Sequence, residues 1–147
     1  MITNTQIQNS DVLKKEYDVF VSYQYSGIEP VLRDKNIQKM VDQVEATGKT
    51  VFCQNIHGRE MKEMNKMTYD EVLAFALEVE ERCKEIYFYI IYPNESTGMK
   101  AELGHAIKNN IPGKLIILNE LQYLDWVQPF IKYCRDSSGE VQILDKF

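Results

Sequence analysis

Apolar residues occur along the chain as short dense runs, separated by longer segments in which they recur every three or four positions. The dense runs are rich in β-branched and aromatic residues and predict strands over residues 17–23, 50–53, 86–92, 114–118 and 141–144. The segments between them predict helices over residues 31–46, 70–83, 97–110 and 124–133. Because predicted strands and helices alternate, the pattern indicates an α/β protein with a parallel sheet.

Local signals support this reading of the middle of the chain. The run 86–92 does not alternate between apolar and polar residues, which is typical of a strand buried on both faces of a parallel sheet. Thr68 and Glu71 have the spacing of a capping box, which predicts a helix start at this point. Residues 57–67 mix basic and acidic side chains and are expected to form a mobile loop, and residues 1–16 form a lead-in segment.

The chain has 147 residues, the size of one domain with a proper core, so we expect a single domain over residues 1–147. The predicted architecture is a flavodoxin-like, three-layer α/β/α sandwich with a mostly parallel five-stranded sheet in the order 2-1-3-4-5. In such a sheet, ligands bind beyond the carboxyl ends of the strands where the winding reverses, between strands one and three. This rule places segments 24–27 and 93–98 together at a predicted ligand site.

Composition narrows the possible partners and the compartment. Apolar residues are 44% of the chain and charged residues 27%, as is usual for a globular protein in water. The net charge of −5 argues against non-specific electrostatic binding to nucleic acid or to an anionic membrane. The first ten residues lack the apolar core of a signal peptide, and the longest apolar run is too short to span a bilayer. The three cysteines form no CxxC pattern, which favours a reducing, cytoplasmic location without a disulfide framework or zinc site.

The strongest chemical signal follows the run 86–92. Gly98 falls in the first turn of a predicted helix, and Glu102 lies one turn further along on the same face. Ser96 and Thr97 supply hydroxyl groups beside helix-start amides that favour an anion such as a phosphate. Glu102 could then face the sugar of a bound nucleotide and act as a nucleophile or stabilise an oxocarbenium-like centre. The plainer alternative is a surface glutamate following a turn glycine.

Several further residues have both a structural and a chemical interpretation. Asp70 is either an acid favoured by the helix dipole or a second carboxylate that transfers a proton to a leaving base. Tyr23 and Tyr25 either pack in the core or stack on a base and bond to the carboxylate. Ser26 and Gly27 belong to the turn that enters the predicted crevice, and we count both among the substrate-binding candidates.

Other kinds of site find little support in the sequence. The two histidines, His57 and His105, lack metal-ligand spacing, and His105 is expected on the exterior of its helix. The chain contains no Ser-His-Asp constellation, GxGxxG pattern or Walker A motif. We therefore expect neither a metal nor a redox cofactor.

The pattern Ser96-x-Gly98-x-x-x-Glu102-Leu103-Gly104-x-Ala106, directly after a buried strand, resembles the signature of the nucleoside 2-deoxyribosyltransferase family, which includes the 2'-deoxynucleoside 5'-phosphate N-hydrolases. The resemblance implies a small flavodoxin-like enzyme that cleaves or exchanges the N-glycosidic bond of a nucleoside or nucleotide without a cofactor. It implies that Glu102 takes the deoxyribose, that Ser96 and Gly98 contact the sugar or its 5' group, and that Asp70 donates a proton near the base. It also implies a homodimer or a larger assembly.

A second resemblance involves the first predicted strand. The segment 17–23, with the sequence YDVFVSY, is similar to the first box of TIR domains, some of which cleave NAD at its glycosidic bond with a glutamate on a comparable helix. Both resemblances converge on Glu102. A third interpretation, a non-catalytic nucleotide-binding module, stays open because segment 22–27 differs from the glycine-containing segment usual in the transferase family.

Overall fold

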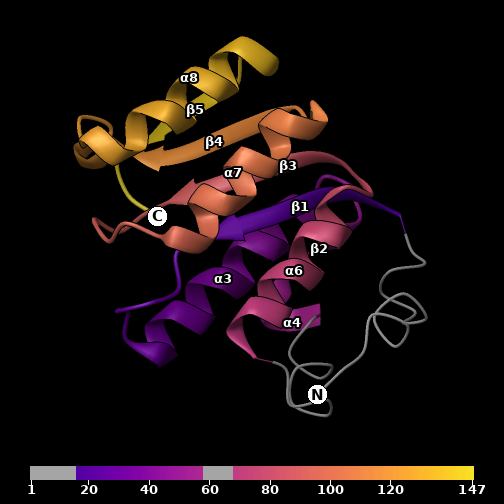
Figure 1. Ribbon diagram of the computed structural model, residues 1–147. Coiled ribbons are helices and arrows are strands. Elements are labelled where there is room, and N and C mark those ends of the chain that lie inside the picture. Colours follow the sequence, from indigo (N-terminus) through magenta and orange to yellow (C-terminus); the bar gives the residue numbers. More distant parts are fainter. Residues whose placement is uncertain (1–15, 58–67) are drawn as a thin grey trace.

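The computed structural model describes residues 16–57 and 68–147, and its centre is a five-stranded sheet in the order β2-β1-β3-β4-β5 (Figure 1). Every neighbouring pair of strands is parallel, as the alternation of strands and helices predicted. The strands are β1 (Tyr17–Tyr23), β2 (Val51–Phe52), β3 (Cys83–Ile90), β4 (Gly113–Leu118) and β5 (Val141–Leu144). The predicted strand order is therefore confirmed.

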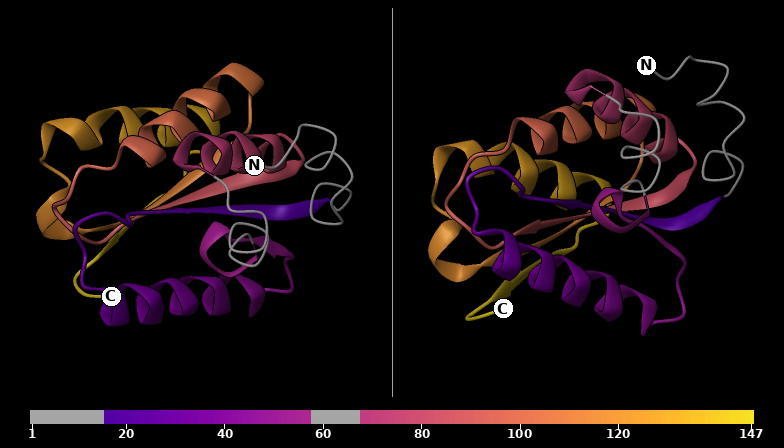
Figure 2. Two further views of the ribbon diagram at one scale, coloured as in Figure 1. Left: turned by 60° about the horizontal axis from the view of Figure 1, so that its bottom comes forward. Right: turned by 90° about the horizontal axis from the view of Figure 1, so that it is seen from below.

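Helices cover both faces of the sheet and complete the three predicted layers. Figure 2 shows α3 (Pro30–Glu45) beneath one face, with α6 (Tyr69–Glu80), α7 (Thr97–Asn109) and α8 (Gln128–Ser137) against the other. Short helical turns complete the described part of the chain: α4 (Gln54–His57), η1 (Asn119–Leu121) and η2 (Asp125–Val127). The chain changes faces between β2 and β3, so its winding reverses between β1 and β3.

The alternation of side chains along β1 divides the core into two parts. Phe20 is fully buried on the face covered by α6, α7 and α8, where it packs in one cluster with Phe75 and Phe130. Val19 and Val21 point to the opposite face and join a cluster that includes the apolar side of α3. Burial of both faces by apolar contact is what holds a parallel sheet between two helical layers.

Strand β3 begins at Cys83, three residues earlier than the predicted start at residue 86. The additional residues pair in register with β1, and Lys84 and Glu85 form ion pairs with Asp18 and Lys49 from the neighbouring strand and loop. Since polar side chains occupy these positions, an apolar run could not reveal them. Helix α6 accordingly ends at Glu80 and not at residue 83.

The last helix differs most from its prediction over residues 124–133. A separate turn, η2, comes first, and α8 then continues to Ser137, with Pro129 in its first turn, where a missing N–H is tolerated. Elsewhere the agreement is closer: the predicted capping box at Thr68 and Glu71 is present, with both reciprocal hydrogen bonds made.

The predicted lead-in and most of the predicted mobile loop, residues 58–67, lie outside the described residues. In the two described ranges, no helix combines the length and the apolar character that a membrane crossing requires.

Candidate functional site

A pocket of about 550 Å³ opens at the carboxyl end of β1, between the N-terminal turns of α6 and α7. Its volume is in the range of small-molecule sites. It lies at the topological switch point, which is the place in an α/β sheet where the winding reverses and ligands bind. The described residues that line it are Tyr23, Tyr25, Ser26, Gln54, Asn55, Val72, Leu73, Ala76, Glu95, Ser96, Thr97, Gly98, Met99 and Glu102.

Most of the candidate residues identified from the sequence meet in this pocket. Those on its wall are Tyr23, Tyr25, Ser26, Ser96, Thr97, Gly98 and Glu102, which come from the end of β1, the turn after it and the start of α7. The two remaining candidates, Gly27 and Asp70, are not among the lining residues. The structure therefore brings together two segments some seventy residues apart, as the switch-point rule predicted.

Glu102 is held by a serine that the sequence analysis did not select. The Ser22 hydroxyl donates a hydrogen bond of 2.7 Å to Oε1 of Glu102, and Ser22 itself is only 1% exposed. Both residues face the α6–α7 side of the sheet, because Ser22 follows Phe20 at the strand period of two. The hydrogen bond fixes the orientation of a carboxyl group that belongs to the pocket wall.

The ionisation of Glu102 is shifted toward the neutral form. Burial raises the pKa of its carboxyl group to about 8, and the hydrogen bond from Ser22 opposes that rise. About one carboxyl in ten is ionised at pH 7 if the pKa is about 8. A carboxylate that ionises at such a high pKa is more basic than an exposed glutamate, which suits nucleophilic or proton-transfer chemistry.

Gln24 joins the end of β1 to the loop that precedes α7. Its side chain is 2% exposed, its Nε2 donates to the carbonyl oxygens of Tyr92 and Asn94, and its Oε1 accepts from the backbone N–H groups of Ile91 and Tyr92. All the donor and acceptor capacity of the amide is thereby used inside the protein. The four hydrogen bonds position the loop from which the pocket-lining start of α7 emerges.

The start of α7 is a capped helix terminus. Ser96 is the N-cap residue, and its hydroxyl accepts a hydrogen bond of 3.2 Å from the Met99 backbone N–H. Glu95, which also lines the pocket, forms an ion pair with Lys100 in the first turn. Hydroxyl groups and backbone amides at a helix N-terminus provide donors for an oxygen-rich ligand.

The two pocket tyrosines have different environments. Tyr23 is partly buried, and desolvation, followed by the charges of Cys53 and Glu102, raises its pKa well above the ordinary value. Tyr25 is 41% exposed, and the Arg33 guanidinium lies 3.8 Å from its ring centroid. Such a cation–π contact fixes the orientation of the exposed ring at the mouth of the pocket.

Gly27 contributes to the turn beside the pocket. Its φ angle is +80°, and a Cβ atom at this position would lie 3.1 Å from the Asn94 side-chain nitrogen. A larger residue would therefore be strained and would press on the loop that Gln24 ties to β1. This geometry gives Gly27 a supporting position next to the predicted crevice.

Asp70 lies in the first turn of α6 and is exposed. It comes two and three residues before Val72 and Leu73, which line the pocket from the same helix. The capping of this helix is performed by Thr68 and Glu71. Asp70 takes no part in that capping box, but its place in the first turn of α6 is the one that the helix-dipole interpretation requires. Its proton-transfer role stays a prediction.

The remaining lining residues were not selected from the sequence. Gln54 and Asn55 follow β2, and Gln54 has a buried Oε1 atom for which the described residues provide no hydrogen-bond partner. Val72, Leu73 and Ala76 form an apolar wall on α6. The switch-point rule points to the loops after β1 and β3, so it could not identify a wall supplied by a helix that packs beside them.

Two other sequence expectations concern metals and His105. Within residues 16–57 and 68–147, no group of three histidine, cysteine or acidic side chains is arranged to hold a metal ion. The His105 side chain is 17% exposed, and its Nε2 lies 2.8 Å from Oε1 of Glu81, the residue that follows α6. His105 therefore lies partly exposed on α7, and the end of α6 covers one side of its ring.

Comparisons of the sequence with protein-family models and with curated proteins find no match.

Proposed function

We propose that this protein cleaves, or transfers across, the N-glycosidic bond of a nucleoside or nucleotide, with Glu102 as the nucleophile. The observation that carries the proposal is the position of the Glu102 carboxyl group, which lies on the wall of the switch-point pocket and accepts a hydrogen bond from Ser22. An aligned carboxylate beside a sugar-sized space is the requirement for a covalent glycosyl intermediate.

The reaction proceeds in two displacements. In the first, an ionised Glu102 oxygen forms a bond to the anomeric carbon, the bond from that carbon to the base nitrogen breaks, and its electron pair leaves with the base, which takes up a proton. In the second, water or another base attacks the same carbon, the ester bond breaks, and Glu102 returns to the carboxylate form. Water attack releases a proton and gives hydrolysis, whereas attack by a second base gives transfer.

The parts of the pocket suit the parts of such a substrate. The apolar wall on α6 provides a surface for the flat base. The Oε1 atom of Gln54, which has no partner among residues 16–57 and 68–147, can accept a hydrogen bond from a base N–H group. Ser96 and Gly98 lie at the N-terminus of α7, where hydroxyl and amide donors favour the 5' oxygen or phosphate. Asp70, at the edge of the same wall, is the candidate proton donor to the leaving base.

The alternatives use the same pocket. A TIR-like activity would cleave NAD at its nicotinamide ribose bond, and the TIR-like segment of the sequence coincides with β1 from Tyr17 to Tyr23. A non-catalytic module would bind a nucleotide there without turnover. The pocket and the Glu102 carboxyl group on its wall are compatible with all three interpretations, so substrates of each kind must be compared.

The decisive experiment measures free base by chromatography after incubation with deoxynucleosides, deoxynucleotides and NAD. We expect base release from at least one of these substrates, and we expect Glu102→Gln to reduce it by about 10³-fold or more, because the amide cannot form the ester. Acid-quenched wild-type protein should carry one pentosyl group on the peptide that contains Glu102.

Glu120→Gln is the matched control, since Glu120 is an exposed glutamate in η1 and takes no part in the pocket. Equal base release by wild-type protein and Glu102→Gln would exclude Glu102 as the nucleophile. Thermal stabilisation by a nucleotide without base release from any substrate would instead support the binding module.

The predicted homodimer or larger assembly and the predicted cytoplasmic location belong to this proposal. Sedimentation velocity with and without nucleotide tests the assembly. The described cysteines, Cys53, Cys83 and Cys134, are free and buried, which is compatible with a reducing compartment.

A further inference from the structure

Glu80, the last residue of α6, is a buried acid that the proposed reaction does not use. Its exposed fraction is 0%, and neither carboxyl oxygen has a hydrogen-bond partner among the described residues. The other fully covered polar side chains of the described core, Ser22 and Gln24, are both hydrogen-bonded. An unpartnered carboxylate would be very costly in such a place, so the group must be held in its neutral form.

The position of Glu80 connects it to the pocket. Val72, Ala76 and Glu80 follow one another at intervals of four residues and therefore form one row along α6. Val72 and Ala76 are part of the apolar pocket wall, and Glu80 continues the row one turn deeper. Helix α6 packs directly on α7, which carries Glu102.

The charges that act on Glu80 come from two acidic neighbours, Glu102 on α7 and Glu81, which directly follows Glu80 at the end of α6. Burial, with smaller contributions from these charges, raises the pKa of Glu80 to about 9. Cys83 on β3 and Tyr133 on α8 also face this region, and burial is the main cause of the raised pKa of each. Both of these groups therefore stay neutral while Glu102 and Glu80 titrate.

We propose that Glu80 is a positioning residue for the Glu102 pocket: its protonated form closes the contact between α6 and α7, and its ionisation beside an ionised Glu102 disrupts that contact. This inference rests on the proposed function for its effect on catalysis, although the coupling of the two carboxyl groups can be measured without turnover. An ionised Glu102 would repel an ionised Glu80, and the described residues provide neither Glu80 oxygen with a donor to offset its lost hydration.

The consequence is an upper pH limit for the site. Glu102 must ionise to act as a nucleophile, whereas Glu80 must stay protonated to keep the apolar wall of α6 in place. Activity should therefore rise with pH as Glu102 ionises near pH 8 and fall as Glu80 ionises near pH 9. The narrow interval between the two steps would follow from the charge that each carboxyl group places on the other across the contact between α6 and α7.

The experiment compares wild-type protein with Glu80→Gln, in which a neutral amide of the same shape replaces the protonated acid. Wild-type kcat/KM should fall about tenfold per pH unit above the second step, whereas Glu80→Gln should stay within about twofold of its maximum. Glu78→Gln is the matched control, because Glu78 is an exposed glutamate of the same helix, and it should keep the wild-type profile. A residue with a merely structural role would change stability without removing the alkaline fall.

The second readout needs no turnover. Carbon-13 spectra of labelled glutamate carboxyl groups follow the Glu102 signal, which is assigned by its loss in Glu102→Gln. This signal should titrate with two inflections in wild-type protein and with one in Glu80→Gln. If no substrate is cleaved but two inflections are seen, the proposed function fails and the coupling stands. The same titration of Glu102 in both proteins would overturn the proposal. Glu80→Leu provides the same comparison if the amide variant does not fold.

Discussion

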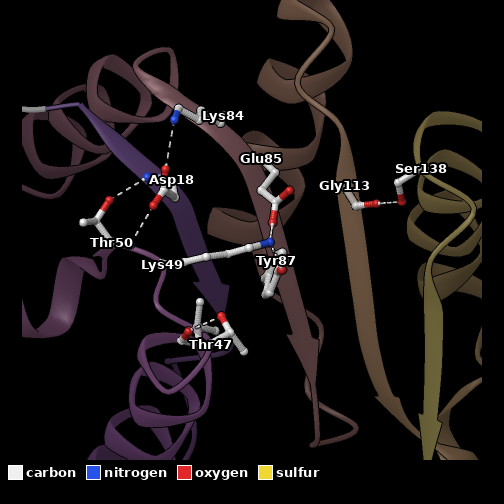
Figure 3. A network of polar contacts seen from close by, with 10 residues as sticks. Asp18, Thr47, Lys49, Thr50, Lys84, Glu85, Tyr87, Gly113 and Ser138 are labelled. Carbon is white, nitrogen blue, oxygen red and sulfur yellow. Dashed lines mark hydrogen bonds and ion pairs between the residues drawn. The ribbon is translucent and has the colours of Figure 1, made fainter.

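The two ends of the sheet contain similar acidic residues in opposite electrostatic states. At the amino end, Glu85 accepts a 2.7 Å ion pair from Lys49, and Asp18 is bound by Lys84 and by Thr50 (Figure 3). At the carboxyl end, Glu102 has a serine hydroxyl as its hydrogen-bond partner and no ion pair with the described residues. One end stabilises charge and the other suppresses it.

The pKa values follow this division. Hydrogen bonds from the Thr50 backbone and from Lys84 lower the pKa of Asp18, and hydrogen bonds to Glu85 and Tyr87 raise the pKa of Lys49, so both groups are held charged. Burial raises the pKa of Glu102 instead. The difference shows that solvent access and cationic partners, and not residue type, decide at which end of the sheet a carboxyl group is held neutral.

The largest expected effect concerns stability and pH. The folded pKa of Glu102 exceeds the unfolded value of 4.5, so its contribution to stability is fully present below about pH 4.5 and is lost as the pH rises through about 8. Between about pH 5.5 and 8.5, the free energy of unfolding measured in urea should therefore fall in wild-type protein. In Glu102→Gln this fall should be about 2–3 kcal/mol smaller.

Glu85→Gln tests the other side of that comparison. It removes an ion pair that is partly exposed to solvent, so the pH dependence of stability in this range should stay close to that of wild-type protein. If both variants change the pH dependence equally, the two ends of the sheet do not differ as the pKa values indicate.

A smaller loss of stability is expected when the Gln24 hydrogen bonds between β1 and the loop before α7 are removed. Gln24→Ala removes four buried hydrogen bonds and leaves backbone groups unpaired, which should cost about 2 kcal/mol of stability and raise KM. Thr50→Ala removes an exposed hydrogen bond, which the Asp18 backbone N–H donates to the Thr50 hydroxyl at the amino end of the sheet. This change should lower the free energy of unfolding by less than about 1 kcal/mol. Denaturant midpoints of the two variants measure the difference, and equal losses would show that the burial of the Gln24 amide is unimportant.

The smallest predicted effect isolates the hydrogen bond to Glu102. Because the Ser22 hydroxyl lowers the pKa of that carboxyl group, Ser22→Ala should move the rising limb of kcat/KM to higher pH. A shift of about one pH unit would reduce kcat/KM about tenfold at pH 7, and the ratio should narrow as the pH rises. If Glu102 acts as a general acid and not as a nucleophile, activity will fall with rising pH, and this variant will not lower it at pH 7.

The sequence predicted the elements whose local pattern and burial agree. Strand β1 spans the predicted residues 17–23 because its apolar side chains alternate between two buried faces. The start of β3 was missed because Lys84 and Glu85 pair with charges on neighbouring segments, a stabilisation that apolar periodicity cannot reveal. At this strand the prediction failed because tertiary ion pairs, and not hydrophobic burial, extend it.

The site was predictable to the extent that it follows from topology. The switch-point rule selected the ends of β1 and β3, and the pocket contains Glu102 and Ser96 as a result. Ser22 could have been found, since the period of two places it on the same face as Phe20. Glu80 lies in a run of acids, and only the row through Val72 and Ala76 distinguishes it from its exposed neighbours.

Strand β2 contains only two residues and forms one edge of the sheet. So short an edge presents few unpaired backbone groups to which an extended segment of another molecule could add. The short edge therefore limits strand addition by another molecule on the side of the sheet that leads to Gln54 of the pocket wall.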